Sequence, residues 1–383
     1  MKIILAPDSF KGTFSSLEVI QYLEEAAIRN LGQVDIIKVP IADGGEGTVD
    51  CLVAAANGEY RTVKVMGPLK QMRVEAKYGI INGKTAVIEM AQASGLPLVP
   101  VHKRDPLNAT TYGTGQMIKA ALDEGIRDFI IGIGGSATND GGIGAAQALG
   151  VEFLDRDNHL IGFGGKELGR ISRIVPDGID PRIRESTITV ICDVTNPLTG
   201  PNGATAVYGP QKGVDESSFD ILETGMKNYE RLIKEISGMD MSQIPGSGAA
   251  GGLGAALVAF FGAVLKPGID TVLDYVDFDE LLDGADFVVT GEGRIDGQSI
   301  YGKVPIGIAK RCMAKGIKVI AIVGGIGQKV EKVYDNGIYS IMPTVNAPMS
   351  LDEAMDRGEE LLKDAADRMF KFIRLGMMLQ QNL

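Results

Sequence analysis

The chain has few of the residues that build disulfide frameworks and metal centres. Its 383 residues include no tryptophan, two histidines and three cysteines. Cys51, Cys192 and Cys312 are odd in number and far apart, so they predict neither a disulfide framework nor a CxxC metal site, and they suit a reducing cytoplasm. His102 and His159 are distant from each other, which disfavours a histidine triad or a zinc centre. Acid–base chemistry is therefore expected to fall to carboxylates or lysines.

The sequence also lacks long apolar runs and any excess of positive charge. No stretch approaches the ~18 apolar residues of a membrane helix, and the apolar run near the N-terminus is too short for a signal peptide. We therefore expect a cytoplasmic protein without a membrane partner. The net charge is −11, and lysines and arginines form no stripe, so no nucleic-acid partner is expected. The oligomeric state stays open, with a homodimer as one option.

Glycine, by contrast, is abundant: the chain has 51 glycines, clustered in loops that follow short apolar runs. At both ends of the sequence, such runs alternate with glycine-rich loops and helical patterns, as in a parallel α/β sheet. Ser15 and Glu18 form a capping box before one of these helices. From Tyr60 onward the residue pattern is typical of β-strands, and Asn82-Gly83 predicts a hairpin turn.

These patterns predict an α/β protein with two domains. We expect a Rossmann-like three-layer domain with a mostly parallel sheet, formed by residues 1–65 and 285–383. A second, inserted α/β domain with antiparallel or mixed strands is expected at residues 66–284. Smaller expectations are a hairpin at 151–163, a strand ending near Thr290 and one final helix at about 351–375.

The stretch 129–150, FIIGIGGSATNDGGIGAAQALG, is interpreted as a buried strand, a tight loop and a helix. Its glycines permit sharp turns and let the backbone come close to a ligand in the turn. The N-terminus of the following helix would attract an anion. Ser136, Thr138, Asn139 and Asp140 add polar groups. A glycine-rich turn capped by Asp140 is the alternative.

Two further glycine loops match nucleotide-binding patterns incompletely. GxGxxG at 246–251 follows no apolar strand, so helix packing is favoured over dinucleotide binding. GQSIYGK at 297–303 has the spacing of a P-loop, but Val304 stands where a serine or threonine would bind the metal. We reject a true P-loop and keep Lys303 as a cation near a helix start.

Charged side chains follow several predicted strands. Asp8, Ser9 and Lys11 follow the first strand, Asp43 and Glu46 the second, and Glu292, Arg294 and Asp296 a later one. Carboxylates that converge with cations and glycine loops suit a site for Mg²⁺ and phosphates. Helix capping, turn formation and a salt-bridged surface loop remain alternatives.

Five long motifs follow one another along the chain: APDSFKGTFSS at 6–16, ADGGEGT at 42–48, GIGGSATNDGG at 132–142, GSGAAGGLGAAL at 246–257 and TGEGRIDGQSIYGK at 290–303. Together they resemble the motifs of the bacterial type-1 glycerate kinases. The resemblance spans most of the chain. It implies a two-domain fold with the active site in the cleft, and ATP-dependent phosphorylation of D-glycerate, usually to 2-phosphoglycerate.

With that resemblance, we assign hypothetical roles. The catalytic candidates are Lys11, Asp193 and Asp8. The substrate-binding candidates are Ser9, Lys11, Arg294, Ser136 and Asn139. The residues expected to bind the cofactor ATP are Gly134, Gly135, Thr138, Gly248, Gly251, Gly252 and Lys303. The expected Mg²⁺ ligands are Asp43, Glu292 and Asp296.

Two other function classes remain open at this point. GxGxxG and the α/β character allow a nicotinamide-dependent oxidoreductase of hydroxy acids, although no ribose-binding acid follows at the expected place. A non-catalytic sensor of a small organic acid is the second alternative. ATP–Mg²⁺ would stabilise a kinase against heat and NAD an oxidoreductase, whereas a sensor would bind glycerate without consuming ATP.

Overall fold

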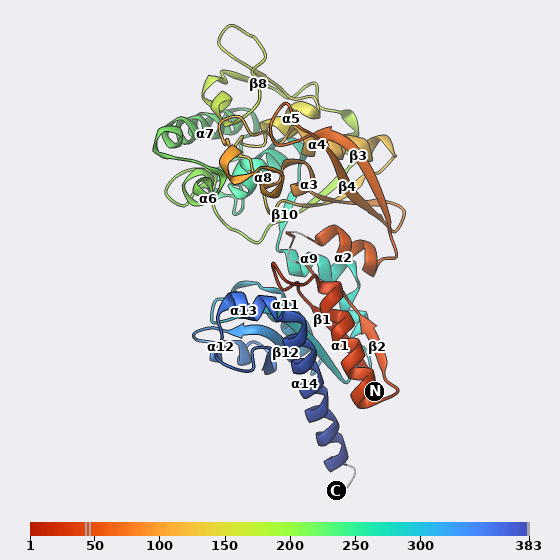
Figure 1. Ribbon diagram of the computed structural model, residues 1–383. Coiled ribbons are helices and arrows are strands. Elements are labelled where there is room, and N and C mark those ends of the chain that lie inside the picture. The colour runs from red at the N-terminus through yellow and green to blue at the C-terminus, as the bar shows by residue number, and fades with distance from the viewer. Residues whose placement is uncertain (43, 46, 381–383) are drawn as a thin grey trace. The chain divides into compact units, whose positions relative to one another are not determined.

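A computed structural model describes residues 1–42, 44–45 and 47–380 and divides into two compact units (Figure 1). The first unit comprises Met1–Asp43, Asp50–Ala56 and Gly268–Leu383, and the second comprises Gly44–Val49 and Asn57–Pro267. The sequence assigned residues 44–49 and 57–65 to the first domain and 268–284 to the second; here the first two ranges fall in the second unit and 268–284 in the first.

The first unit contains a five-stranded sheet in which all neighbouring strands are parallel. Its order is β13-β12-β11-β1-β2. The strands are β1 (Lys2–Pro7), β2 (Asp35–Lys38), β11 (Phe287–Ile295), β12 (Lys318–Ile326) and β13 (Ile338–Pro343). In order of appearance along the chain this is 2-1-3-4-5, a doubly wound order of the flavodoxin type. The predicted Rossmann-like domain with a mostly parallel sheet is confirmed.

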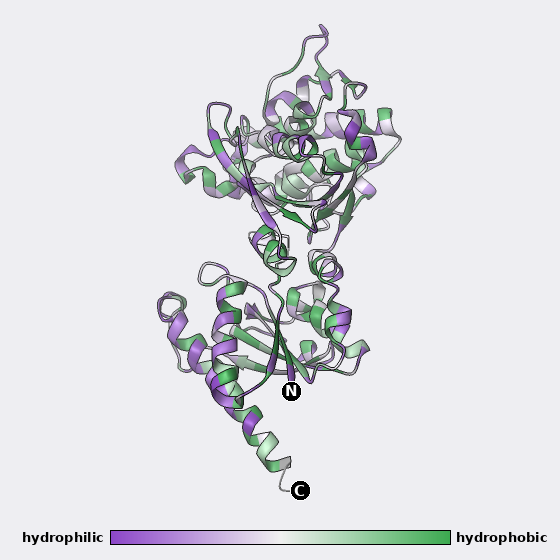
Figure 2. Ribbon diagram, turned by 90° about the vertical axis from the view of Figure 1, so that its right-hand side faces the viewer, coloured by the Kyte–Doolittle hydropathy of each residue, from purple (hydrophilic) through white to green (hydrophobic). Residues whose placement is uncertain are grey.

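Helices bury both faces of this sheet. Ile3, Leu5 and Val289 pack with residues of α1 (Ser16–Leu31) and α14 (Gly358–Gln380). Ile4 and Val288, which alternate with them and therefore face the other way, are fully buried as well. Figure 2 shows the hydrophobic residues concentrated on the strands of this sheet.

The remaining helices of the first unit are short, and α11 packs against β11 and β12. They are α9 (Gly268–Tyr275), α10 (Phe278–Leu281), α11 (Val304–Ala314), α12 (Glu331–Tyr334) and α13 (Leu351–Asp356), while α2 (Thr48–Ala55) joins the two units in sequence. The predicted capping box at α1 is confirmed, since Ser15 and Glu18 hydrogen-bond each other's backbone N–H.

The second unit contains a six-stranded mixed sheet of order β10-β9-β6-β5-β4-β3. The strands are β3 (Glu59–Met66), β4 (Arg73–Ile81), β5 (Thr85–Glu89), β6 (Asp128–Gly132), β9 (Thr187–Ile191) and β10 (Val264–Lys266). Strands β5, β6, β9 and β10 are parallel, whereas β3 and β4 are antiparallel. The predicted Asn82-Gly83 hairpin is confirmed, with both residues at positive φ.

The α-helices of the second unit are α3 (Ala91–Ser94), α4 (Tyr112–Asp123), α5 (Ile143–Ala148), α6 (Ala204–Lys212), α7 (Glu216–Ser237) and α8 (Ala249–Phe261). All of them except α6, which packs against α7 and α8, contribute residues to one large hydrophobic core with this sheet. A separate two-stranded sheet pairs β7 (Glu152–Leu154) with β8 (Arg173–Val175).

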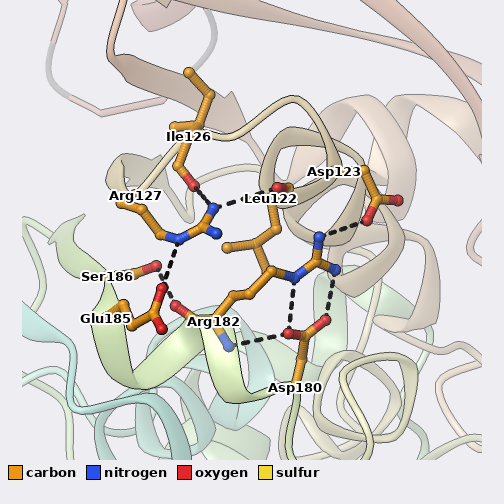
Figure 3. A network of polar contacts seen from close by, with 8 residues as sticks. All are labelled: Leu122, Asp123, Ile126, Arg127, Asp180, Arg182, Glu185 and Ser186. Atoms are coloured by element: carbon orange, nitrogen blue, oxygen red, sulfur yellow. Dashed lines mark hydrogen bonds and ion pairs between the residues drawn. The ribbon is translucent and has the colours of Figure 1, made fainter.

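A network of ion pairs ties the end of α4 to the segment before β9 (Figure 3). Arg182 donates to both oxygens of Asp180, at 2.9 and 2.7 Å, and its Nη1 lies 2.8 Å from Asp123 Oδ1. Arg127, just before β6, donates to Glu185. The Arg182 guanidinium holds the pKa of Asp180 below its usual value. The network thus fixes the amino-terminal ends of β6 and β9, two strands whose other ends carry candidate site residues.

The predicted hairpin at 151–163 is short but present: Leu154 bridges Leu160, the Ile161 N–H donates to Phe153 O at 3.0 Å, and β7 pairs with β8 as well. Two other local predictions are wrong. The predicted final helix is two helices, α13 and α14. Strand β11 continues past Thr290 to Ile295, because the ladder to β12 extends as far as Ile295. Within the described ranges, no helix combines the length and hydropathy that crossing a membrane requires.

Candidate active site

Asp8 lies where ligands bind in doubly wound sheets. Between β1 and β11 the strand order changes direction, and ligands of such sheets bind at the carboxyl ends of these strands. Asp8 directly follows β1 and is 7% exposed. Its N–H donates to Gly291 O of β11 at 2.9 Å, and its Oδ1 accepts from the Ser9 N–H at 2.7 Å.

Lys11 is exposed on the same loop. A Cβ added at Gly293 of β11 would lie 3.7 Å from the Phe10 Cα and 3.9 Å from the Lys11 N. The backbone of this loop is therefore a neighbour of the end of β11. The structure therefore brings the predicted residues Asp8, Ser9 and Lys11 beside the end of β11.

Glu292, on β11 itself, is 6% exposed and bound by two partners. Lys303 Nζ lies 3.0 Å from its Oε2, and Ser299 Oγ donates to its Oε1 at 3.0 Å. Lys303 also donates to Arg294 O at 3.0 Å. Burial raises the pKa of Glu292, and Lys303 and Ser299 oppose that rise. The predicted cofactor contact Lys303 and the predicted metal ligand Glu292 thus form an ion pair.

Arg294 and Asp296 complete this charged group at the end of β11. Arg294 is exposed, with its Nε 3.8 Å from Asp296 Oδ2. Asp296 Oδ1 accepts from the Gln298 N–H at 2.9 Å, which is turn formation of the kind kept as an alternative. Lys303 is the N-cap residue of α11, as predicted, at a helix end that favours anions. Asp43, the third predicted metal ligand, lies outside the described residues.

In the second unit, the predicted glycine loop follows β6. Gly134 is partly exposed and Gly135 is exposed, but Thr138 and Asn139 are fully buried. Asn139 Nδ2 donates to Thr205 Oγ1 at 3.0 Å. Among the described residues, no partner binds Thr138 Oγ1 or Asn139 Oδ1. Two buried polar atoms without a partner in one loop mark it as a place where a polar ligand would satisfy them.

Asp140 is buried and structural. Its Oδ2 accepts from the Thr111 N–H at 2.8 Å and from the Thr111 hydroxyl at 2.9 Å, and its Oδ1 accepts from the Gly142 N–H at 3.1 Å. Burial nevertheless raises its pKa, while these donors lower it. The α5 N-cap is Gly142, so Asp140 organises the turn before the helix instead of capping it as the N-cap residue.

Lys212, which sequence reasoning did not single out, is buried in the last turn of α6. Its Nζ donates to Ser136 Oγ and to Thr138 O, each at 2.8 Å. Burial lowers its pKa to about 7, although Asp140 opposes the shift. A lysine in the last turn of a helix before a glycine is typical of an exposed C-terminal cation, so nothing in the residue pattern predicts this burial.

The loop before α8 packs its glycines directly against neighbouring backbone. Ala250, Gly251 and Gly252 have left-handed φ and ψ inside the α8 range. A Cβ at Gly251 would lie 2.1 Å from Thr138 O, and one at Gly248 would lie 2.1 Å from Pro197 O. Gly141 donates its N–H to Gly251 O at 2.9 Å. These contacts support the packing interpretation of GxGxxG and join two predicted phosphate loops.

The carboxyl ends of β9 and β5 bring two more motifs to this place. Asp193 is exposed just after β9. Three residues later, the backbone carbonyl of Asn196 accepts from the Gly248 N–H at 3.0 Å. A Cβ at Gly134 would lie 3.0 Å from the Gly45 Cα, and the Val49 N–H donates to Glu89 at 2.8 Å. Within the second unit, residues 44–45 thus adjoin the loop 132–142, and this loop in turn adjoins the motif at 246–257.

One group of three potential metal ligands occurs among the residues described. Asp155, Asp157 and His159 have ligand atoms within 4.8 Å of one another in a partly exposed turn. Asp155 Oδ1 accepts the backbone N–H groups of Asp157 and His159, so the geometry is that of a turn.

Comparison with known proteins gives one consistent result. Residues 3–374 match the glycerate kinase family. A glycerate kinase of Halalkalibacterium halodurans is 50% identical over 365 residues, which is 95% of this chain and 96% of the relative. A glycerate 2-kinase of Escherichia coli is 45% identical, covering 98% of this chain and 99% of the relative.

A solved structure agrees with these relatives. The crystal structure of a candidate glycerate kinase 2 from Salmonella typhimurium LT2 superposes with a TM-score of 0.88 at 42% identity, over 100% of both chains. The predicted α/β fold and the resemblance drawn from the five motifs are both confirmed. The nicotinamide oxidoreductase and the organic-acid sensor are not favoured. This chain belongs to the glycerate kinase family of enzymes.

Proposed function

We propose that this enzyme phosphorylates D-glycerate with ATP and that the product is 2-phospho-D-glycerate. The glycerate hydroxyl oxygen would form the new bond to the γ-phosphorus as the bond from that phosphorus to ADP breaks. The hydroxyl proton would pass to a carboxylate. Such a transfer depends on positioning and charge stabilisation more than on covalent chemistry by the protein, which suits a chain with few histidines and cysteines.

The observation that carries the proposal is the charged group at the switch point of the first unit. Asp8, Lys11, Glu292 and Lys303 gather around the ends of β1 and β11, next to the start of α11. The cations and the helix N-terminus would attract phosphate or carboxylate despite the acidic net charge. We assign Lys11 and Arg294 to the anionic groups of the ligands, Ser9 to the substrate and Lys303 to a phosphate of ATP.

The base for the hydroxyl proton is proposed to be Asp193, with Asp8 as the other candidate. Asp193 is exposed at the end of β9, whereas Asp8 is 7% exposed. A base must lie within hydrogen-bond reach of the hydroxyl in the bound complex, and either residue is on a loop at a strand end. From the second unit we assign Gly134, Gly135, Thr138, Gly248, Gly251 and Gly252 to the phosphates, and Ser136 and Asn139 to glycerate.

Mg²⁺ fits the carboxylate chemistry at the end of β11. Each oxygen of Glu292 has one partner and keeps a further acceptor site, and Asp296 supplies another carboxylate four residues on. We propose Glu292 and Asp296 as ligands, with Asp43 as the third. When bound, Mg²⁺ would neutralise phosphate charge. Lys303 would keep the Glu292 carboxylate oriented through its contact with Oε2.

The test is to incubate the full chain with ATP, Mg²⁺ and D-glycerate and to identify the product by NMR. We expect one ADP per 2-phosphoglycerate, and we expect excess chelator to remove the activity. A 3-phosphoglycerate product would correct the hydroxyl assignment. Formation of no phosphoglycerate would contradict the proposed function, and turnover unaffected by chelation would contradict the Mg²⁺ site.

A further inference from the structure

Lys212 is a buried cation that the proposed chemistry does not use. It is 1% exposed, yet its ammonium group has no acidic hydrogen-bond partner among the residues described: it donates to Ser136 Oγ and to the Thr138 carbonyl. Burying an ammonium group costs free energy, and a neutral donor such as an amide could bridge the same two oxygens more cheaply. A role that needs the charge explains its presence better than a structural tie does.

The bond to Ser136 fixes the direction of a proton. Burial lowers the pKa of Lys212 to about 7, and in its charged form the ammonium group only donates. Ser136 Oγ then accepts, and its single hydroxyl proton points away from Lys212. In the part of the chain that the structure describes, no oxygen accepts that proton. Ser136 is 7% exposed, so its hydroxyl is nearly buried but is not sealed off.

We infer that Lys212 is a positioning residue that acts through Ser136, and that the Ser136 hydroxyl donates to an anionic oxygen of the bound ligand. Accepting from a cation polarises the hydroxyl and strengthens the hydrogen bond that it donates. The same ammonium holds the Thr138 carbonyl and so fixes the backbone on both sides of Ala137. The inference rests on the proposed function for the identity of the ligand, which offers carboxylate oxygens on D-glycerate and phosphate oxygens on ATP.

A second observation points to a ligand at this loop. Thr138 Oγ1 and Asn139 Oδ1 are buried and have no partner within the described chain. A loop that leaves two buried polar atoms unsatisfied and directs the Ser136 hydroxyl proton away from its own cation is short of a polar partner. The Thr138 hydroxyl could donate to an anionic oxygen of the ligand, whereas Asn139 Oδ1 needs a donor such as a hydroxyl of D-glycerate.

The experiment measures ligand affinity separately from turnover. Calorimetric dissociation constants for ATP, D-glycerate and inorganic phosphate are compared for the wild type, Ser136→Ala, Ser136→Thr, Lys212→Met and the double variant Ser136→Ala/Lys212→Met. Losing a hydrogen bond to a charged ligand group should weaken binding about 10-fold or more in Ser136→Ala and in Lys212→Met. The double variant should be no weaker than the worse single variant, because Lys212 acts only through the hydrogen bond that the Ser136 hydroxyl donates to the ligand. Ser136→Thr keeps the hydroxyl and should bind within about threefold of the wild type.

Ser218→Ala is the matched control. Ser218 is also a buried serine of the second unit, 5% exposed, and its hydroxyl belongs to the capping box of α7. This variant should melt at a lower temperature and bind every ligand normally. The Ser218→Ala variant shows the effect of losing a purely structural serine. If Lys212→Met fails to fold, Ser136→Ala alone still tests the inference.

The three ligands tested, ATP, D-glycerate and inorganic phosphate, separate the outcomes. Weakening confined to D-glycerate assigns the contact to its carboxylate, and weakening of ATP and phosphate assigns it to a phosphate. Unchanged affinities for all three ligands in Ser136→Ala would overturn the inference, as would fully additive losses in the double variant. If the wild type binds phosphate but forms no phosphoglycerate, the proposed function fails, and the phosphate arm still decides the role of Ser136.

Discussion

Replacing Gly251 by alanine should lower activity greatly and destabilise the second unit strongly. The added Cβ would lie 2.1 Å from Thr138 O and 2.7 Å from Asn139 Cα, both backbone atoms of the neighbouring loop. Relief of such a clash requires the two loops to separate. Combined with the cost of a left-handed alanine, we expect a loss of at least about 3 kcal/mol in the free energy of unfolding. Displacement of the loop by about 1 Å should lower kcat/KM about 100-fold.

Gly262→Ala is a control in the same helix. Gly262 caps the carboxyl end of α8 with φ +65°, close to the +69° of Gly251, but nothing lies within 4 Å of its added Cβ. It should cost only about 1 kcal/mol and leave kcat/KM unchanged. Thermal melting and initial rates of phosphoglycerate formation measure both variants. Equal melting temperatures and equal rates for the two would show that the contact between the loops is unimportant.

Lys303→Met should lower kcat by about 10²- to 10³-fold, since it removes a fixed cation from the proposed phosphate position at the start of α11. It also leaves the buried Glu292 carboxylate without its ion-pair partner. Lys303 lowers the pKa of Glu292, so its removal should raise that pKa further. Because the ionised carboxylate is the form that would bind Mg²⁺, the acid limb of the kcat/KM profile should move to higher pH.

Lys315→Met is its control, because Lys315 is also a lysine of the α11 region and pairs with an acid, Asp283. It should stay within about twofold of the wild type, as expected for a surface ion pair. Rates are measured with ATP and Mg²⁺ at several pH values. A Lys303→Met variant with normal kcat and an unmoved acid limb would exclude Lys303 from the phosphate site and would leave its bond to Glu292 as a purely structural contact.

Local signals predicted the parts of the fold that local interactions stabilise. The Ser15–Glu18 capping box fixes the start of α1, and Asn82-Gly83 adopts the positive φ values that its hairpin requires. The resemblance of the five motifs supplied the family. The alternation of strands and helices indicated a parallel sheet, but nothing near β1 signals that its partner is β11.

Tertiary contacts decided the rest. Residues 291–294 read as a loop because they combine two glycines with two charges, yet pairing with β12 keeps them extended. Ala250 reads as helical and adopts φ +55°, because the loops around it hold the backbone there. The position of Lys212 before a glycine is typical of an exposed helix end, yet its side chain is buried and donates to the glycine loop after β6. In each case the deciding partner is far away in sequence, beyond the reach of propensity or periodicity.

The pairing of β1 with β11 has a consequence for biosynthesis. Ile3 pairs with Phe287, which the ribosome adds roughly 280 residues later. At about 5–20 residues per second, β1 waits on the order of 14 to 60 s for its neighbour, while all of the second unit has already been synthesised. During that interval the apolar N-terminal strand can pair with β2 but lacks β11, the partner on its other edge. The nascent chain, more than the finished enzyme, is the stage at which this fold is exposed to aggregation and to chaperones.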